Sequence, residues 1–83
     1  MRWEEVVGHN VKRLRKAREL TQEALAHAAD IDTRYVGGIE RGQENPSVAV
    51  LGRIAAALDV HPAVLLTGDR EAADGERDDR ICP

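Results

Sequence analysis

Apolar residues recur at helical spacing through most of the first two thirds of the chain. The clearest stripe lies at i, i+4 and i+7 and is made of Val7, Val11 and Leu14. Because basic residues stand between its members, this stripe predicts an amphipathic helix over about residues 3–18. Thr21 follows at a position typical of an N-cap, and the Ala-rich segment 22–29 after it has a strong helix propensity. The chain is therefore predicted to begin with two successive helices.

A tight turn is predicted between the second helix and a third. Asp30 suits this turn, because Asp tolerates the left-handed backbone region better than most residues other than glycine. Asp32 is the predicted N-cap of the third helix, which covers about residues 33–41 and stops at Gly42. Two short helices joined in this way, at about residues 21–41, have the plan of a helix-turn-helix motif.

The last two predicted helices begin at a serine and a proline. Ser47 can cap a fourth helix that runs to Leu58. Its predicted buried stripe, at spacings of three and four, comprises Val48, Leu51, Ala55 and Leu58. Pro62 at a first helical position predicts a short fifth helix. Because no strand pattern is present, the predicted fold class is all-α, a bundle of five short helices.

Length and charge divide the chain into two parts. The 83 residues are enough for one folded domain, which we assign to residues 1–68. Residues 69–83 carry six acidic and three basic side chains, and we expect them to form a disordered acidic tail. This excess accounts for the whole net charge of −3. The folded part is neutral overall, but residues 12–18 carry five basic side chains and no acidic one, which favours contact with a polyanion.

The inventory of reactive side chains argues against catalysis and metal binding. Ser47 is the only serine and is explained as a cap, Cys82 is the only cysteine, and the three histidines lack the spacing of metal ligands. We therefore expect no enzyme activity, no metal and no cofactor. The chain also lacks a run of about 20 apolar residues and a signal-peptide pattern, so we expect a cytoplasmic protein that makes no membrane contact.

Five short segments resemble one family of regulators. They are Val7-Gly8, Leu14-Arg15, Leu20 to Ala26, Ile39-Glu40-Arg41-Gly42 and Asn45-Pro46-Ser47. Over about residues 5–67 the chain is similar to the Cro/C1-type (XRE) helix-turn-helix regulators. This resemblance implies a lambda-repressor-like bundle of five helices that binds DNA. The stretch from Tyr35 to Gln43 is most similar to the controller proteins of restriction–modification systems, which are dimeric transcription factors that regulate their own operon.

Candidate base contacts follow from the position of the third helix. In such folds this recognition helix enters the major groove and presents its N-terminal residues to base edges. Thr33 and Arg34 are the expected contacts, and the Arg34 guanidinium can bind guanine O6 and N7 together. Tyr35 is expected either near the DNA or half-buried against the core. Gly37 and Gly38 stand where many relatives have larger side chains, and we expect the backbone at Gly38 to approach the bases closely.

The resemblance also implies contacts with the DNA backbone. Gln22 matches the family's position for a phosphate contact that can also brace a base-contacting residue. The other expected backbone contacts are Arg41, Gln43, Asn45 and Lys12. Arg15 is implied to form a partly buried ion pair with Glu40 that orients the recognition helix, and we expect it to contact a phosphate as well.

A homodimer is expected, because one motif that reads about four bases is too unspecific to regulate a gene. Its seam is expected at the corner after the fourth helix and at the fifth helix, where some of the residues must instead belong to the core. The residues are Val60, Pro62, Val64, Leu65 and Leu66. Trp3 is expected to cover the fifth helix or the edge of the dimer.

Together these expectations describe a sequence-specific regulator of transcription. It binds double-stranded DNA of the nucleoid as a homodimer on a near-palindromic operator, and the controller-like stretch favours autoregulation, with repression by occlusion as the default. The alternative is an antitoxin-type interaction module whose acidic tail binds a protein partner. In a third reading the tail tunes DNA affinity by repelling phosphate.

Overall fold

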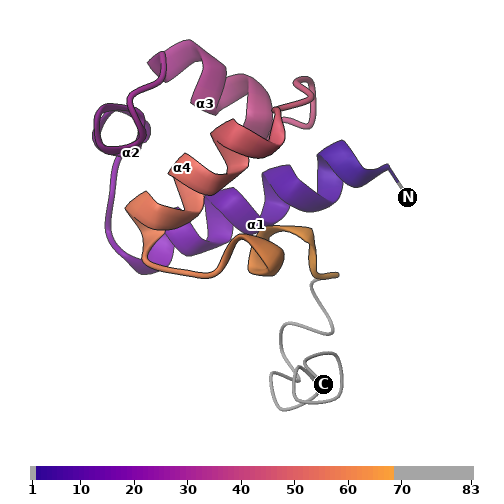
Figure 1. Cartoon of the computed structure of the whole chain (residues 1–83). Helices are drawn as coiled ribbons and strands as arrows, with labels where there is room; N and C mark the ends of the chain where they lie inside the picture. Colours follow the sequence, from indigo (N-terminus) through magenta and orange to yellow (C-terminus); the bar gives the residue numbers. More distant parts are fainter. Residues whose placement is uncertain (1, 69–83) are drawn as a thin grey trace.

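The computed structural model describes residues 2–68, and within that range the chain folds into four α-helices and one 3-10 helix, with no strand (Figure 1). In chain order they are α1 (Trp3–Ala17), α2 (Gln22–Ala29), α3 (Thr33–Glu40), α4 (Val48–Leu58) and η1 (Pro62–Leu66). The long helix α1 contacts α3 and α4 and also η1, while α2 packs against both α3 and α4. The fold is all-α, as the sequence predicts. The expected acidic tail, residues 69–83, lies outside the described residues.

The fifth helix was predicted with the wrong type, because it is a 3-10 helix of five residues rather than an α-helix. His61 caps it, since its Nδ1 accepts a hydrogen bond from the backbone N–H of Ala63 at 3.0 Å. At its other end the carbonyl oxygens of Val64 and Leu65 accept hydrogen bonds from the side chain of Asn10. These carbonyls are thus satisfied by α1 and need no further helical turn, which explains the early end of η1.

The predicted N-caps are present at three helices. Thr21 Oγ1 accepts from Ala24 N at 2.9 Å, and Asp32 Oδ1 accepts from Arg34 N at 2.7 Å. At the start of α4, Ser47 Oγ accepts from the third amide of that helix, at 3.1 Å. Each cap satisfies an amide that has no partner within its helix, and a cap of this kind typically contributes about 1 kcal/mol. These local signals therefore fix where α2, α3 and α4 begin.

All four α-helices stop at a residue in the left-handed region. These residues are Glu19, Asp30, Gly42 and Asp59, with φ between 59° and 75°. In each case the following amide turns back to a carbonyl five residues earlier, which closes the helix end. The residues that donate these amides are Leu20, Ile31, Gln43 and Val60. Three of them pack their apolar side chains on the core, whereas the one after α3 is polar and exposed.

The core is formed by aliphatic side chains from every helix. Its fully buried members include Val11, Leu25, Val36, Ile39, Ile54, Ala55, Leu58 and Leu65. The predicted stripe of α4 is wrong at Val48, which is 83% exposed. It also omits Ile54, which is fully buried. Val48 opens α4, and no other element covers the stripe at that first turn. Periodicity identifies the face of a helix but not how far along that face the neighbouring helices reach.

A close approach of α1 to the end of α3 positions the recognition helix. A Cβ atom on Gly8 would lie 2.2 Å from the carbonyl oxygen of Ile39 and 3.0 Å from that of Glu40. Both oxygens belong to backbone that cannot give way, so only glycine fits at this position of α1. The α1 helix therefore lies directly against the last turn of α3.

Candidate nucleic-acid interface

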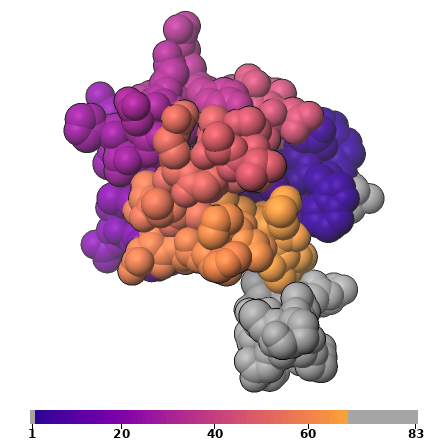
Figure 2. Space-filling view, viewed as in Figure 1, coloured from indigo at the N-terminus to yellow at the C-terminus, as the bar shows by residue number. Residues whose placement is uncertain are grey.

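Helices α2 and α3 form the helix-turn-helix pair that the sequence predicts. The turn is three residues long, and Asp30 adopts the left-handed conformation at φ 61°. Ala26 is 1% exposed on α2, which contacts α3, so a small side chain allows the two helices to approach. Figure 2 shows the magenta segment around the start of α3 projecting from the top of the molecule. The pair is therefore at the surface, with the beginning of α3 outermost.

The N-terminal turn of α3 presents two side chains to solvent. Thr33 and Arg34 are both exposed, and the Arg34 side chain has 94% of its area accessible. Its Nε lies 3.8 Å from Asp32 Oδ1, a loose contact between two exposed groups. Tyr35 is half-buried and packs against the core. The structure thus leaves Arg34 free to move toward a ligand and holds Tyr35 in place.

The last turn of α3 is held by a buried network of polar side chains. Arg15 donates from Nε to Glu40 Oε2 at 2.6 Å and from Nη2 to Oε1 at 3.2 Å. Its Nη1 donates to the carbonyl oxygen of Leu20 at 2.7 Å. Gln22 Nε2 donates to Glu40 Oε1 at 3.0 Å. The side chains of Arg15 and Glu40 are only 11% and 3% exposed, so this network joins α1, α2 and α3 away from water.

The network also sets the charge state of Glu40. Burial raises the pKa of its carboxyl group, but hydrogen bonds from Arg15 and Gln22 and the positive charges of Arg15 and Lys12 lower it. The net result is a pKa below the ordinary value of 4.5. Glu40 is therefore an anion at neutral pH, and it holds two donors that belong to different helices.

Gln22 and Arg15 have different capacities left for DNA. Gln22 has two amide hydrogens, and Glu40 takes one, so the second is available to a phosphate oxygen at the start of α2. Arg15 uses three of its five N–H groups on Glu40 and Leu20, and its side chain is only 11% exposed. Its expected phosphate contact stays a prediction, and in the described structure its function is to fasten α3.

The two glycines of α3 make room for side chains from the following loop. A Cβ on Gly37 would lie 3.1 Å from Nη1 of Arg41, and one on Gly38 would lie 2.7 Å from Cγ of Glu44. Arg41 also donates from Nε to Gln43 Oε1 at 3.1 Å. Both glycines are buried beneath these side chains. The expected approach of Gly38 to a base stays a prediction, and no pattern in the sequence indicates that Glu44 covers this position.

The basic stretch of residues 12–18 is divided between several faces of α1. Lys12 is exposed and close enough to Glu40 to lower its pKa. Arg13 donates to Asn10 Oδ1 at 3.5 Å. Arg18 donates to the carbonyl oxygens of Leu58 and Asp59, where it caps the end of α4. The run of charge in the sequence therefore does not form one continuous basic surface.

The predicted dimer seam is only partly at the surface. Pro62 and Leu66 are exposed and Val60 and Val64 are half-buried, but Leu65 is fully buried in the core of the protomer. The reason is that η1 directs this side chain inward among α1 and α4, which it contacts. Leu65 is accordingly a core residue, and the exposed part of the segment consists of its neighbours.

Asn10 is the residue of α1 that holds this segment, and sequence analysis missed it. Its side chain is fully buried, and Nδ2 donates to the carbonyl oxygens of Leu65 at 2.9 Å and Thr67 at 2.7 Å, with Val64 at 3.3 Å. An asparagine beside Val11 on the buried stripe was the available signal, because a buried amide must find partners. It fastens η1 to α1.

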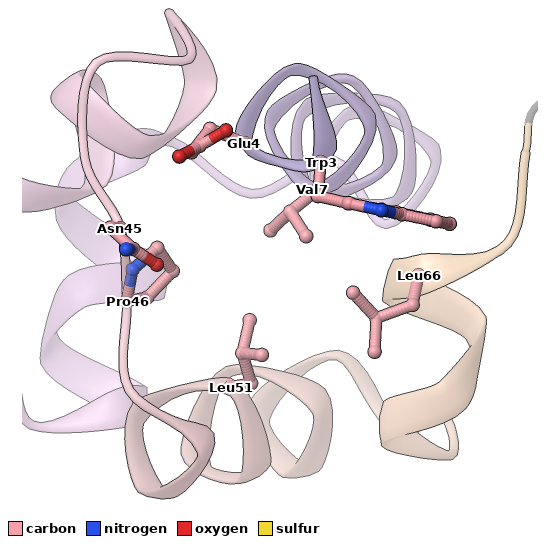
Figure 3. A pocket seen from close by; sticks show the side chains of 7 residues that line it. All are labelled: Trp3, Glu4, Val7, Asn45, Pro46, Leu51 and Leu66. Atoms are coloured by element: carbon pink, nitrogen blue, oxygen red, sulfur yellow. The ribbon is translucent and has the colours of Figure 1, made fainter. Parts of the chain in front are cut away.

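A groove opens beside the seam, between the start of α1, the loop after α3, α4 and η1 (Figure 3). Its lining residues are Trp3, Glu4, Val7, Asn45, Pro46, Leu51 and Leu66. Trp3 is 63% exposed and forms one wall of this groove together with Leu66 of η1. Its expected place over η1 or at the edge of a dimer stays a prediction. Asn45, an expected backbone contact, is exposed at the opposite wall.

Residues 2–68 lack two features that other classes of function require. No helix in this range is both long enough and apolar enough to cross a membrane. Nor does the same range contain a group of three or more His, Cys, Asp or Glu side chains placed to hold a metal ion.

Known proteins are similar to this chain in sequence and in fold. The helix-turn-helix family model HTH_3 matches residues 11–65. The HTH-type transcriptional regulator y4dJ of Sinorhizobium fredii is 38% identical over 72 residues, which cover 87% of this chain and 94% of that protein. The restriction-modification controller protein C.AhdI from Aeromonas hydrophila is 42% identical, with a TM-score of 0.73 over 75% of this chain and 94% of its own. The biofilm regulator SinR, solved in complex with DNA, is 34% identical, with a TM-score of 0.71 over 74% and 98%.

Proposed function

The chain belongs to the HTH_3 (XRE) family of helix-turn-helix transcriptional regulators, and on that premise we propose that it acts as a homodimer on a near-palindromic operator. The observation that carries the proposal is that the N-terminal turn of α3 is exposed while its C-terminal turn is held by buried hydrogen bonds. Arg34 is accessible over 94% of its side chain, while Glu40 at the other end is 3% exposed and bound to two helices. A helix held in this way presents its first turn to the major groove in a fixed orientation.

Base reading is assigned to the first turn of α3. We assign to Arg34 two hydrogen bonds with a guanine, and to Thr33 a contact with the adjacent base. Tyr35, which is half-buried, supports this turn and reaches the edge of the groove. Gly38 contributes through its backbone only. Discrimination of the correct base by a bidentate arginine is worth about 1–3 kcal/mol.

Contacts with the sugar-phosphate backbone position the helix in its groove. Gln22 donates its free amide hydrogen at the N-terminus of α2, where the backbone amides and the helix dipole also favour a phosphate. On the far side of α3 the exposed loop residues Gln43 and Asn45 and the cation of Arg41 hold the next phosphates. Lys12 adds electrostatic attraction, and Arg15 acts through Glu40.

Dimerisation is assigned to the exposed residues around η1, which are Val60, Pro62, Val64 and Leu66. A two-fold dimer places its recognition helices about one turn of DNA apart and so reads two half-sites. The likeness to C.AhdI, a restriction-modification controller, supports an operator next to the regulator's own gene. Such a protein acts in the cytoplasm, at the nucleoid, and represses when its site overlaps a promoter. The alternative of a protein partner for residues 69–83 has no support among the described residues or the relatives.

The test is fluorescence anisotropy with the duplex upstream of its own gene and a scrambled duplex, at about 50–300 mM salt. We expect tight binding to the native duplex alone, with a steep fall in affinity as salt rises. Arg34→Ala is expected to lose about 1–3 kcal/mol of discrimination per half-site. Arg53→Ala removes an exposed arginine from α4 and is the matched control, which should bind like the wild type. Equal and weak binding of the wild type to both duplexes would contradict the proposal.

A further inference from the structure

One face of the recognition helix carries a carboxylate that the helix itself does not supply. Arg34, Gly37, Gly38 and Arg41 lie at i, i+3, i+4 and i+7 and form a single stripe along α3. Two of these four positions have no side chain. The proposed function places this stripe toward the major groove, and the inference below rests on that function.

Glu44 occupies the gap at the second glycine. A Cβ on Gly38 would lie 2.7 Å from Cγ of Glu44, 3.1 Å from Oε2 and 3.4 Å from the carboxyl carbon. The side chain of Glu44 therefore lies flat against the helix, in the space that any residue other than glycine would fill. Glu44 as a whole is half-buried there. The loop after α3 thus places a carboxylate on the stripe four residues after Arg34.

The carboxylate of Glu44 has no hydrogen bond or ion pair with any residue in the range 2–68. Arg41, a cation on the stripe, directs its Nε to Gln43 Oε1 and its Nη1 over Gly37. Glu44 differs in this from Glu40, both of whose oxygens accept hydrogen bonds from Arg15 or Gln22. An ionised carboxylate accepts hydrogen bonds and cannot donate them. It is therefore suited to a ligand that donates.

We propose that Glu44 is a specificity-determining residue that accepts a hydrogen bond from the N4 amino group of a cytosine in the major groove. Cytosine N4 is the donor with which Asp and Glu side chains pair when they read bases. The same negative charge repels phosphate groups, so it weakens binding to DNA that offers no such donor. Glu44 thereby separates specific from non-specific DNA through one attractive and one repulsive effect.

The experiment is selection of binding sites from a randomised duplex library by the wild type and by Glu44→Gln. The wild type is expected to select cytosine at one position of each half-site, by about tenfold over the other bases. Glutamine keeps the size of the side chain but pairs best with adenine, so the variant should lose this preference or exchange it for adenine. Anisotropy with a scrambled duplex should show tighter non-specific binding by the variant, by about two- to fivefold.

Two further variants separate base reading from charge and from folding. Asp59→Asn removes one negative charge at the η1 end of the molecule and is expected to keep the cytosine preference. Gly38→Ala keeps Glu44 but displaces it from the helix, and Ala favours the helical state, so this variant folds and should lose the same preference.

Several results would overturn the inference. The first is identical selection by the wild type and Glu44→Gln. The second is a Gly38→Ala variant with an unchanged cytosine preference, and the third is a wild-type preference for adenine at this position. A wild type that selects a site without any contribution of Glu44 leaves the proposed function intact. A wild type that selects no sequence at all contradicts both.

Discussion

Asn10 and Arg15 are two buried polar residues of α1, and they hold different neighbours by different chemistry. Asn10 is a neutral amide that donates to backbone carbonyl oxygens in and just after η1. Arg15 is a cation that binds the carboxylate of Glu40 and so holds α3. One helix therefore fixes the proposed dimer seam with one residue and the recognition helix with the other.

The difference lies in what each contact needs from its partner. Backbone carbonyls are present whatever the sequence of η1, so Asn10 places no demand on the side chains of the seam. Arg15 depends on one other side chain, because a buried charge without its counter-ion is very unfavourable. The seam can therefore change its side chains while its attachment is kept, whereas the attachment of the recognition helix requires both Arg15 and Glu40.

The largest expected effect is that of Arg15→Met. This substitution leaves the carboxylate of Glu40 buried with only the Gln22 amide as a partner, and we expect a loss of about 3–5 kcal/mol in the free energy of unfolding. Chemical denaturation measures it. Lys16→Met changes the exposed neighbour and should stay within about 0.5 kcal/mol of the wild type. A chemical denaturation curve of Arg15→Met that overlays the wild type would show that the pair is not needed for stability.

A double variant sharpens this result. Arg15→Met combined with Glu40→Met removes both charges and fills the site with apolar side chains, so most of the lost stability should return. DNA discrimination should still fall, because Gln22 then has no carboxylate to hold it at the start of α2. Recovery of both properties together would mean that the network stabilises the fold without orienting the recognition helix.

Asn10→Ala comes next in size. It leaves the carbonyl oxygens of Val64, Leu65 and Thr67 without the donor that they share, at a cost of about 1–3 kcal/mol. Because those residues belong to the η1 segment, we expect the dimer of this variant to dissociate at a higher protein concentration than the wild-type dimer. Analytical ultracentrifugation measures this concentration. Arg13→Ala, which removes only the 3.5 Å contact with Asn10, is the control. Unchanged dimerisation in Asn10→Ala would separate the seam from this attachment.

The sequence was informative wherever one segment decides its own structure. The three side-chain caps, the left-handed Asp30 and the helix-turn-helix pair follow from residues that act on their immediate neighbours. The burial of Val48 was predicted incorrectly, and the sequence did not show that Leu65 is the member of the expected seam that belongs to the core, because exposure depends on where other helices end. The attachment of η1 by Asn10 and the position of Glu44 over Gly38 join segments that periodicity cannot relate. Pairing of Arg15 with Glu40 came from family resemblance and not from spacing.

Acid should weaken the α3 attachment more than the η1 attachment. The pKa of Glu40 in the folded protein is lower than its ordinary value of 4.5, so its contribution to stability is present above that value. It is lost as the pH falls through the folded-state pKa. We expect the unfolding free energy of the wild type to decline more steeply than that of Glu40→Gln between about pH 5 and pH 3. Parallel pH profiles for the two proteins would show that Glu40 does not contribute to acid sensitivity.

The smallest expected effects come from the helix ends that lead to the two attachments. Asp30, before α3, and Asp59, before η1, hold a left-handed backbone and place a negative charge at the unfavourable end of a helix dipole. Glycine removes both penalties, so Asp30→Gly and Asp59→Gly should each gain about 0.5–1 kcal/mol in unfolding free energy. Gly42→Ala has the opposite geometry, since it adds a side chain at φ 75° and 3.1 Å from Glu5, and should be destabilising. Stabilisation by Asp59→Gly alone would mean that the turn before α3 needs the side chain of Asp30, whereas the turn before η1 does not need that of Asp59. The two ends of the molecule would then differ in their loops as well as in their attachments.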